Sequence, residues 1–147
     1  MAQFCDYWSK MTSDYVILDM VREGVKIEFD QTPWQNIAPK PYVFNMRKKQ
    51  MIDHKIEQYI LKGIVEEAQF EEGQFISNIF AEPKSDGDIR IILDLTELNK
   101  YVTDRHFKME NIEVVKNLIR PGCYMASIDW KDAYYSVKIQ EKDRKYL

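Results

Sequence analysis

The sequence predicts an α+β fold from two kinds of apolar pattern. In 46–62 and 109–119, apolar residues recur every three or four positions, which is typical of one face of a helix. In 74–82 and 89–95, separated by a tight-turn signal, the pattern is that of two strands of a hairpin. A further apolar run at 123–129 predicts a strand. The order helix, hairpin, helix, strand indicates an α+β domain.

Length and composition indicate one ordinary domain or part of a larger protein. Of the 147 residues, 45% are apolar and 13% aromatic, which suffices to bury a core and argues against disorder. The net charge of -3 argues mildly against a free-standing duplex-binding domain. A local basic groove is still compatible with this net charge. Cys5 and Cys123 suggest neither a zinc site nor a disulfide framework, so we expect an intracellular, reduced protein. No stretch reaches the roughly 20 apolar residues of a membrane span, so no membrane partner is expected.

Residues 1–45 are predicted to form an N-terminal arm with short elements. Apolar spacings of three and four predict a short helix that reaches Met11. Thr12-Ser13-Asp14 is a capping signal for a second helix, which would end at Gly24. Alternation in 25–29 then predicts a strand, and a proline-containing linker follows it.

The helix at 46–62 and the hairpin after it are the clearest elements. Ile52, Ile56 and Ile60 form one apolar stripe, and Gly63 is well placed to follow the C-cap. In the second strand, apolar residues occupy every second position from Ile89. Arg90 is therefore expected to point away from the apolar face.

Two carboxylates after the last predicted strand, Asp129 and Asp132, form the first candidate site. The strand at 123–129 is apolar enough to be central, and a carboxylate at its end can reach a divalent cation such as Mg²⁺. Asp132 either lies close to the same cation, or its backbone N–H donates a hydrogen bond to a triphosphate oxygen. Alternatively, Asp129 simply caps a helical turn.

Basic and aromatic side chains form two further candidate sites. Lys84 and Arg90 flank the hairpin tip. There they either bind a triphosphate, Arg as a bidentate fork and Lys as a point charge, or are solvated surface cations. Tyr134 and Tyr135 follow the carboxylates. They either stack on a base or sugar and test for a ribose 2′-OH, or are core aromatics.

The combined motifs resemble the reverse transcriptases of retroelements, most closely those of gypsy-like and DIRS-like retrotransposons. The fingers motifs are Phe75-Ile76-Ser77-Asn78-Ile79-Phe80, Pro83-Lys84-Ser85-Asp86-Gly87-Asp88-Ile89-Arg90 and Leu93-Asp94-Leu95-Thr96-Glu97-Leu98-Asn99-Lys100. Residues 124–139 resemble the palm segment that carries the first catalytic aspartate, motif A. The resemblance implies an arm at 1–45, a fingers subdomain at 46–122 and the start of the palm at 123–147. We therefore expect a truncated right-hand polymerase.

The resemblance implies a role for each candidate residue near motif A. Asp129 matches the aspartate that binds both Mg²⁺ ions, and Trp130 would lend its backbone carbonyl to the ion on the nucleotide side. Asp132 and Ala133 match residues whose backbone N–H groups hold the triphosphate of the incoming dNTP. Tyr134 matches the aromatic residue that blocks the sugar 2′-OH.

The resemblance also implies roles in the fingers. Arg90 and Lys84 match basic residues that lie over the dNTP triphosphate. Asp94 lies in a segment similar to the template-gripping part, so an RNA or DNA primer–template is the expected partner. The full enzyme would carry out RNA-directed DNA synthesis, in which a primer 3′ hydroxyl attacks the α-phosphate and pyrophosphate leaves.

One shared motif of the family does not occur in this sequence. Family enzymes take further metal-binding carboxylates from a Tyr-x-Asp-Asp hairpin, and the chain contains no Asp-Asp pair. We therefore expect the chain by itself not to polymerise. Two other interpretations stay open. One is a non-catalytic module that binds nucleic acid or a partner. The other is a degraded gene product with an incomplete core, which would self-associate through the strand edge at 123–129.

Overall fold

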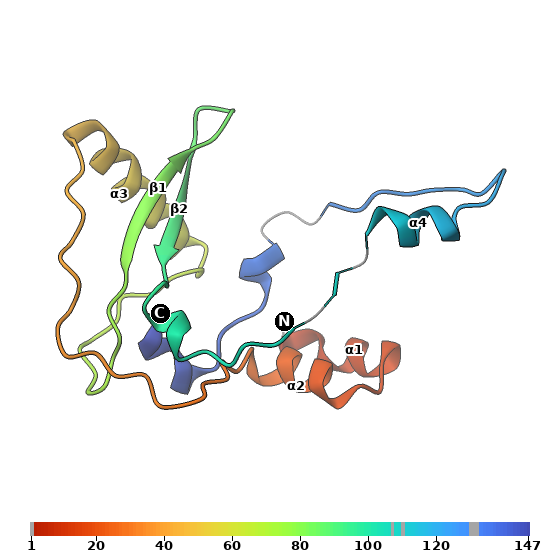
Figure 1. The fold of residues 1–147 in the computed structure, drawn as a ribbon, viewed down its shortest axis with the longest axis horizontal. Coiled ribbons are helices and arrows are strands. Elements are labelled where there is room, and N and C mark those ends of the chain that lie inside the picture. The colour runs from red at the N-terminus through yellow and green to blue at the C-terminus, as the bar shows by residue number, and fades with distance from the viewer. Residues whose placement is uncertain (1, 107, 110, 130–132) are drawn as a thin grey trace.

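The computed structural model describes residues 2–106, 108, 109, 111–129 and 133–147 (Figure 1). It is a small α+β structure, and the antiparallel sheet of the described residues is the predicted hairpin. In chain order the elements are η1 (Ala2–Phe4), α1 (Cys5–Met11), α2 (Tyr15–Glu23), α3 (Met46–Leu61), β1 (Asn78–Pro83), β2 (Ile89–Asp94), η2 (Leu98–Lys100), α4 (Ile112–Leu118), η3 (Ala133–Ser136) and η4 (Glu141–Tyr146). Among the described residues, no helix combines the length and apolar character that crossing a bilayer requires.

The two N-terminal helices confirm the sequence prediction. Asp14 is the N-cap of α2, and its carboxylate accepts hydrogen bonds from the backbone N–H groups of Val16 at 2.9 Å and Ile17 at 3.4 Å. These bonds satisfy donors that a helix start otherwise leaves unpaired. Gly24 ends α2 with a φ of 96°, a region that favours glycine. Figure 1 shows α1 and α2 packed side by side.

Helix α3 and the hairpin form the first core. Asn45 caps α3 by accepting the N–H of Lys48 at 2.8 Å, and Gly63 follows its C-cap with a φ of 66°. Ile52 of α3 is buried against Ala81 of β1 and Ile89 of β2, and Ile56 packs against the same cluster. The predicted apolar stripe therefore faces the sheet at Ile52 and Ile56, whereas Ile60 is 42% exposed. In Figure 1, α3 lies along one face of the hairpin.

The strand register decides which side chains the hairpin leaves exposed. Ala81 pairs with Ile91 on the face that packs on α3. Arg90, one position earlier, pairs with Glu82, and both of these side chains are exposed. The expected orientation of Arg90, away from the apolar face, is therefore confirmed.

A second core joins segments that are distant in the sequence. Phe75, Leu98 and Tyr146 are its buried residues, and the partly buried residues packed against them are Phe29, Leu95 and Tyr101. The 3₁₀ helix η4 reaches this core because the N–H of Phe75 donates to the carbonyl of Lys145 at 2.9 Å. The side chain of Asp143 is buried there and accepts the N–H of Ile27 at 2.9 Å.

The strand predicted at 25–29 does not form. Val25 makes an isolated parallel bridge to Ile139, and Phe29 an isolated antiparallel bridge to Val102. Since the partners come from two different segments, neither bridge extends into a ladder.

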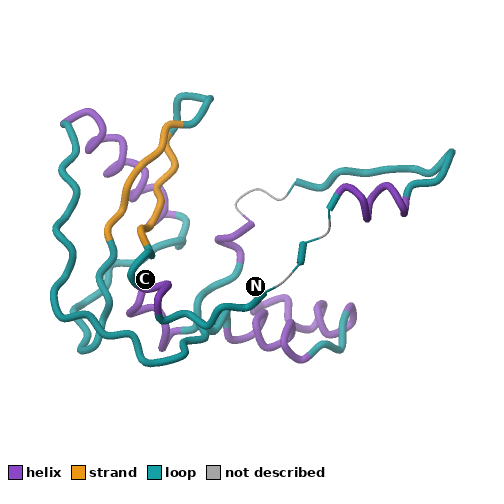
Figure 2. Tube along the Cα trace, viewed as in Figure 1, coloured by secondary structure: helices purple, strands orange, loops and turns teal. Residues whose placement is uncertain are grey.

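The strand predicted at 123–129 is also wrong, because this part of the chain is a loop in the structure (Figure 2). Every described residue from 104 to 135 is exposed, and we call this part the exposed segment. Within it, Tyr124 and Ile128 are 103% and 93% exposed. The predicted helix at 109–119 is present but shorter, as α4. A strand needs a partner for its backbone groups. Within the described chain, no hydrogen bond joins the backbone of 124–129 to another segment.

Replacing Gly24 with Ala should destabilise the protein more than the same change at Gly63. A Cβ at Gly24 would lie 2.6 Å from the carbonyl oxygen of Lys138, whereas a Cβ at Gly63 would have nothing within 4 Å. Both positions carry the strain of a positive φ, about 1–2 kcal/mol, and only Gly24→Ala adds a backbone clash. Urea unfolding of the two variants measures the difference. Equal losses would show that the contact between 24 and 138 does not constrain the fold.

Candidate functional site

The hairpin tip carries the two predicted phosphate-binding cations, Lys84 and Arg90. The turn between them is tight: the N–H of Lys84 donates to the carbonyl of Asp88 at 2.8 Å, and the N–H of Gly87 to the carbonyl of Lys84 at 3.2 Å. The N–H of Asp88 also donates to the Asp86 carboxylate at 3.0 Å. Gly87 has a φ of 83°, which explains why an Asp-Gly pair suits this turn.

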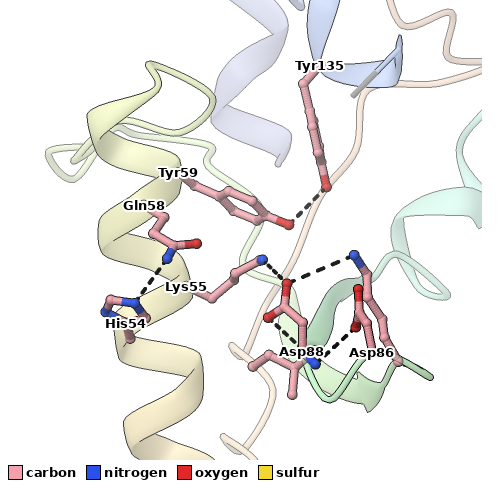
Figure 3. A network of polar contacts seen from close by, with 9 residues as sticks. His54, Lys55, Gln58, Tyr59, Asp86, Asp88 and Tyr135 are labelled. Atoms are coloured by element: carbon pink, nitrogen blue, oxygen red, sulfur yellow. Dashed lines mark hydrogen bonds and ion pairs between the residues drawn. The ribbon is translucent and has the colours of Figure 1, made fainter. Parts of the chain in front are cut away.

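The tip is tied to α3 by an ion pair between Lys55 and Asp88 (Figure 3). Lys55 Nζ lies 2.5 Å from Asp88 Oδ2, and only 14% of the Lys55 side chain is exposed. The hydrogen bond from Lys55 and the backbone N–H of Ile89 lower the pKa of Asp88 below its usual value. Lys84 Nζ lies 4.0 Å from the same carboxylate oxygen. Asp88 therefore faces two ammonium groups.

The segment that follows the predicted metal site reaches the same part of α3. The hydroxyl of Tyr135, in η3, lies 3.5 Å from the hydroxyl of Tyr59, and the two ring centroids are 5.4 Å apart. Lys55 Nζ lies 5.9 Å from the centroid of the Tyr59 ring. In Figure 3, α3 thus presents Lys55 to the hairpin tip and Tyr59 to η3.

Arg90 has a carboxylate as its cross-strand neighbour. Its register partner is Glu82, and residues paired in this way have Cβ atoms about 4.5–5.5 Å apart. A phosphate that approaches Arg90 would therefore also meet the negative charge of Glu82.

Asp94 lies at the far end of β2 from the tip, where its carboxylate is held by neighbours. It accepts the Thr96 hydroxyl at 2.7 Å and the Tyr42 hydroxyl at 3.1 Å. The hydroxyl and backbone N–H of Thr96, followed by the Tyr42 hydroxyl, lower the pKa of Asp94. The same hydrogen bond to Asp94 raises the pKa of Tyr42.

Asp94 also borders a cleft of about 750 Å³ between the hairpin and the preceding linker. The linker is fastened by Gln35, whose side-chain amide accepts the N–H of Ile76 and donates to its carbonyl, both at 2.9 Å. The cleft wall includes Trp34, Lys100 and Ser77. The Ser77 hydroxyl oxygen is buried and has no hydrogen-bond partner in the described part of the chain.

Asp129, the predicted catalytic aspartate, lies in a loop of the exposed segment 104–135 and not at the end of a strand. Trp130 and Asp132 lie outside the described residues, so their predicted roles stay predictions. Across 2–106, 108, 109, 111–129 and 133–147, no group of three or more His, Cys, Asp or Glu side chains could hold a metal ion. The described residues therefore do not by themselves fit a magnesium site at Asp129.

The remaining predicted residues, Ala133 and Tyr134, belong to η3, and the Tyr134 side chain is 95% exposed. The structure thus places Lys84 and Arg90 on the same hairpin, Lys84 beside Asp88 and Arg90 opposite Glu82. It connects η3 to α3 through Tyr135, but no described contact joins Asp129 to the hairpin. Sequence reasoning missed Lys55, which lies four positions before Tyr59 on one face of a helix.

Comparison with known proteins relates the chain to retrotransposons. No protein-family model matches it. It is 25% identical over 126 residues to the transposon Tf2-3 and Tf2-4 polyproteins of Schizosaccharomyces pombe (strain 972 / ATCC 24843). That match covers 85% of the chain and 9% of each polyprotein, so the chain spans a small part of these relatives. A crystal structure of the prototype foamy virus protease-reverse transcriptase aligns with 58% of the chain and 11% of the viral chain, at 20% identity and a TM-score of 0.42.

Acid should weaken the fold through Asp88 and Asp94. Both have a lowered pKa in the folded state. Their contribution to stability is therefore present above the unfolded-state pKa of about 3.9 and is lost as the pH falls through the lower folded-state pKa. We expect Asp88→Asn and Asp94→Asn each to flatten the loss of urea stability between neutral pH and about pH 3.

The matched control for this acid titration is Asp53→Asn, which alters an exposed carboxylate of α3. If the control flattens the pH dependence as much as Asp88→Asn does, the hydrogen-bonded carboxylates are not the source of the acid sensitivity.

Proposed function

We propose that the chain is the fingers region and the start of the palm of a retroelement reverse transcriptase of the gypsy-like or DIRS-like kind, acting inside the cell. The observation that carries this proposal is the relationship to transposon polyproteins, which extends over 85% of the chain. Because the chain spans 9% of those polyproteins, RNA-directed DNA synthesis is proposed for the whole enzyme.

In this proposal the hairpin binds the triphosphate of a dNTP. Arg90 is exposed on the face turned away from α3, so its guanidinium is free to form two parallel hydrogen bonds to phosphate oxygens. Lys84 adds a second positive charge at the same tip, with 38% of its side chain exposed. The Glu82 carboxylate opposes this binding, and a divalent cation bound to the triphosphate would reduce that repulsion.

The template is proposed to lie along the cleft that Asp94 borders. Trp34 and Tyr101 offer aromatic faces for bases, and Lys100 offers a positive charge for the backbone. The unpartnered Ser77 hydroxyl supports a polar ligand in the cleft, since a buried hydroxyl without a partner is unfavourable.

Near motif A, Asp129 and the Trp130 carbonyl are proposed as magnesium ligands, with Asp132, Ala133 and Tyr134 on the dNTP side. The described residues form no group of three or more possible metal ligands, so no chemical step is assigned to them. In the complete enzyme other segments would have to supply those ligands.

The second candidate function is a non-catalytic module that binds nucleic acid or another protein. One observation favours it: the exposed segment 104–135 carries large apolar side chains that normally lie in a core or an interface. The most exposed of them are Met109, Ile112, Leu118, Tyr124, Met125, Ile128 and Tyr134.

Binding of dGTP to the full chain tests the proposed role of the hairpin. Arg90→Gln should weaken binding about tenfold, because charge-assisted hydrogen bonds contribute about 1.5–3 kcal/mol each. Glu82→Gln should strengthen it a few-fold, because it removes the opposing charge. Isothermal titration calorimetry at low salt, with and without Mg²⁺, measures both changes.

The control for charge alone is Arg22→Gln on α2, where the exposed guanidinium donates a hydrogen bond to Cys5 Sγ at 3.8 Å. If Arg22→Gln weakens dGTP binding as much as Arg90→Gln, the hairpin is not the triphosphate site.

Primer extension separates the two candidate functions. We expect the chain to bind an RNA–DNA primer–template weakly, with an affinity that falls steeply as salt rises, and to synthesise no DNA in Mg²⁺. Gel-shift and extension assays on one preparation measure both properties. Magnesium-dependent synthesis would overturn the expectation that further carboxylates are required. The absence of any primer–template binding at low salt would leave only the protein-binding role.

A further inference from the structure

We propose that Lys55 is a positioning residue that sets the hairpin tip and η3 relative to each other through one face of α3. The proposal rests on the proposed function, because the hairpin and η3 carry the residues assigned to the dNTP. It adds a coupling between them that neither the sequence motifs nor the comparisons assign.

Among the lysine ion pairs of the described chain, Lys55–Asp88 is long-range, as Lys145–Glu71 also is, and its lysine is the less exposed of the two, at 14% against 25%. Lys100–Glu97 and Lys116–Glu113 join residues three positions apart, and their side chains are 61–69% exposed. Such pairs contribute little to stability. Lys55 and Asp88 are 33 positions apart, and the Lys55 side chain is largely buried. This pair therefore fixes tertiary structure.

The Asp88 carboxylate is held in a defined orientation on the hairpin side. Its Oδ1 accepts the N–H of Ile89 at 2.8 Å, and its Oδ2 accepts Lys55 Nζ. Asp88 immediately precedes β2, so a constraint on its side chain passes directly to the strand that carries Arg90. Ile89 itself is buried against Ile52, which fixes the other side of this connection.

One turn later on α3, Tyr59 extends the constraint to η3. The Lys55 ammonium lies over the face of the Tyr59 ring, where it is attracted electrostatically. The Tyr59 hydroxyl meets that of Tyr135, next to Tyr134 in the chain. Figure 3 marks the Tyr135–Tyr59 and Lys55–Asp88 contacts, and the Lys55 ammonium lies 5.9 Å from the centroid of the Tyr59 ring between them.

Lys55 also determines how strongly Asp88 attracts Lys84. With Lys55 in place, the Asp88 carboxylate has a close partner, and Lys84 stays at 4.0 Å with part of its side chain exposed. Without Lys55, Lys84 would be the nearest cation to Asp88 and would be drawn away from a ligand. Loss of Lys55 should therefore loosen the tip and weaken triphosphate binding together.

The experiment compares the full chain with Lys55→Met by amide hydrogen exchange of 84–90 and 133–136 and by dGTP titration. We expect Lys55→Met to speed exchange in both segments and to weaken dGTP binding about fivefold or more, a loss in the range of one charge-assisted contact. Lys55→Arg should restore both properties, because a guanidinium can also pair with Asp88. Lys49→Met removes the same charge from an exposed site on α3 and should leave exchange unchanged.

Asp88→Asn separates the loosening of the two segments from the capture of Lys84 by Asp88. It also replaces Lys55→Met in the experiment if circular dichroism shows that Lys55→Met does not fold. It should loosen both segments as Lys55→Met does, but weaken dGTP binding less, because it also releases Lys84. Wild-type exchange in either segment of Asp88→Asn and Lys55→Met would overturn the coupling. Faster exchange with unchanged dGTP affinity in Lys55→Met would overturn the positioning role. If the wild-type chain binds no dGTP, the proposed function fails, while the exchange data still decide the coupling.

Discussion

The structure depends on a closure between two segments that lie 116 positions apart, at Ile27 and Asp143. The Asp143 carboxylate is buried, and a buried carboxylate is unfavourable unless donors meet its charge. The backbone N–H of Ile27 supplies such a donor. Around this bond, Phe29 and Tyr146 pack edge to face with ring centroids 5.0 Å apart, and Leu98 is almost fully enclosed. Backbone hydrogen bonds to the same N-terminal residues hold the chain on either side of the exposed segment. The N–H of Thr103 donates to the carbonyl of Glu28, and the N–H of Gln140 donates to the carbonyl of Val25.

The elements that sequence reasoning predicted correctly are those with local signals. Asp14 and Asn45 cap helices within three residues of themselves, and the turn at Asp86-Gly87 has a hydrogen bond between near neighbours, from the N–H of Asp88 to the Asp86 carboxylate. The strand predicted at 123–129 failed because strand formation requires a partner, and apolar composition does not provide one. The second core was not predicted because η4 is rich in charged residues and has no apolar period.

The candidate site was predicted in the same uneven way. Lys84 and Arg90 were placed correctly beside the hairpin turn because Asp-Gly marks that turn, and strand alternation gave the face of Arg90. The pair of Lys55 with Asp88 depends on how α3 packs on the hairpin, which a local pattern does not specify. Asp129 was expected at a sheet edge, and it lies in a loop since no sheet forms beside it. The relationship to transposon polyproteins and the geometry of the hairpin therefore support different parts of the proposal.

The distance in sequence between Ile27 and Asp143 has a consequence for biosynthesis. Translation proceeds from the N-terminus, so the second core cannot assemble until η4 has left the ribosome. Helices α1 and α2, and α3 with its hairpin, join segments that are closer in sequence than Ile27 and Asp143, and they can form earlier. Until η4 has left the ribosome, the apolar side chains of Phe29, Phe75 and Leu98 lack the partners of the second core. The nascent chain is therefore prone to aggregate during that interval.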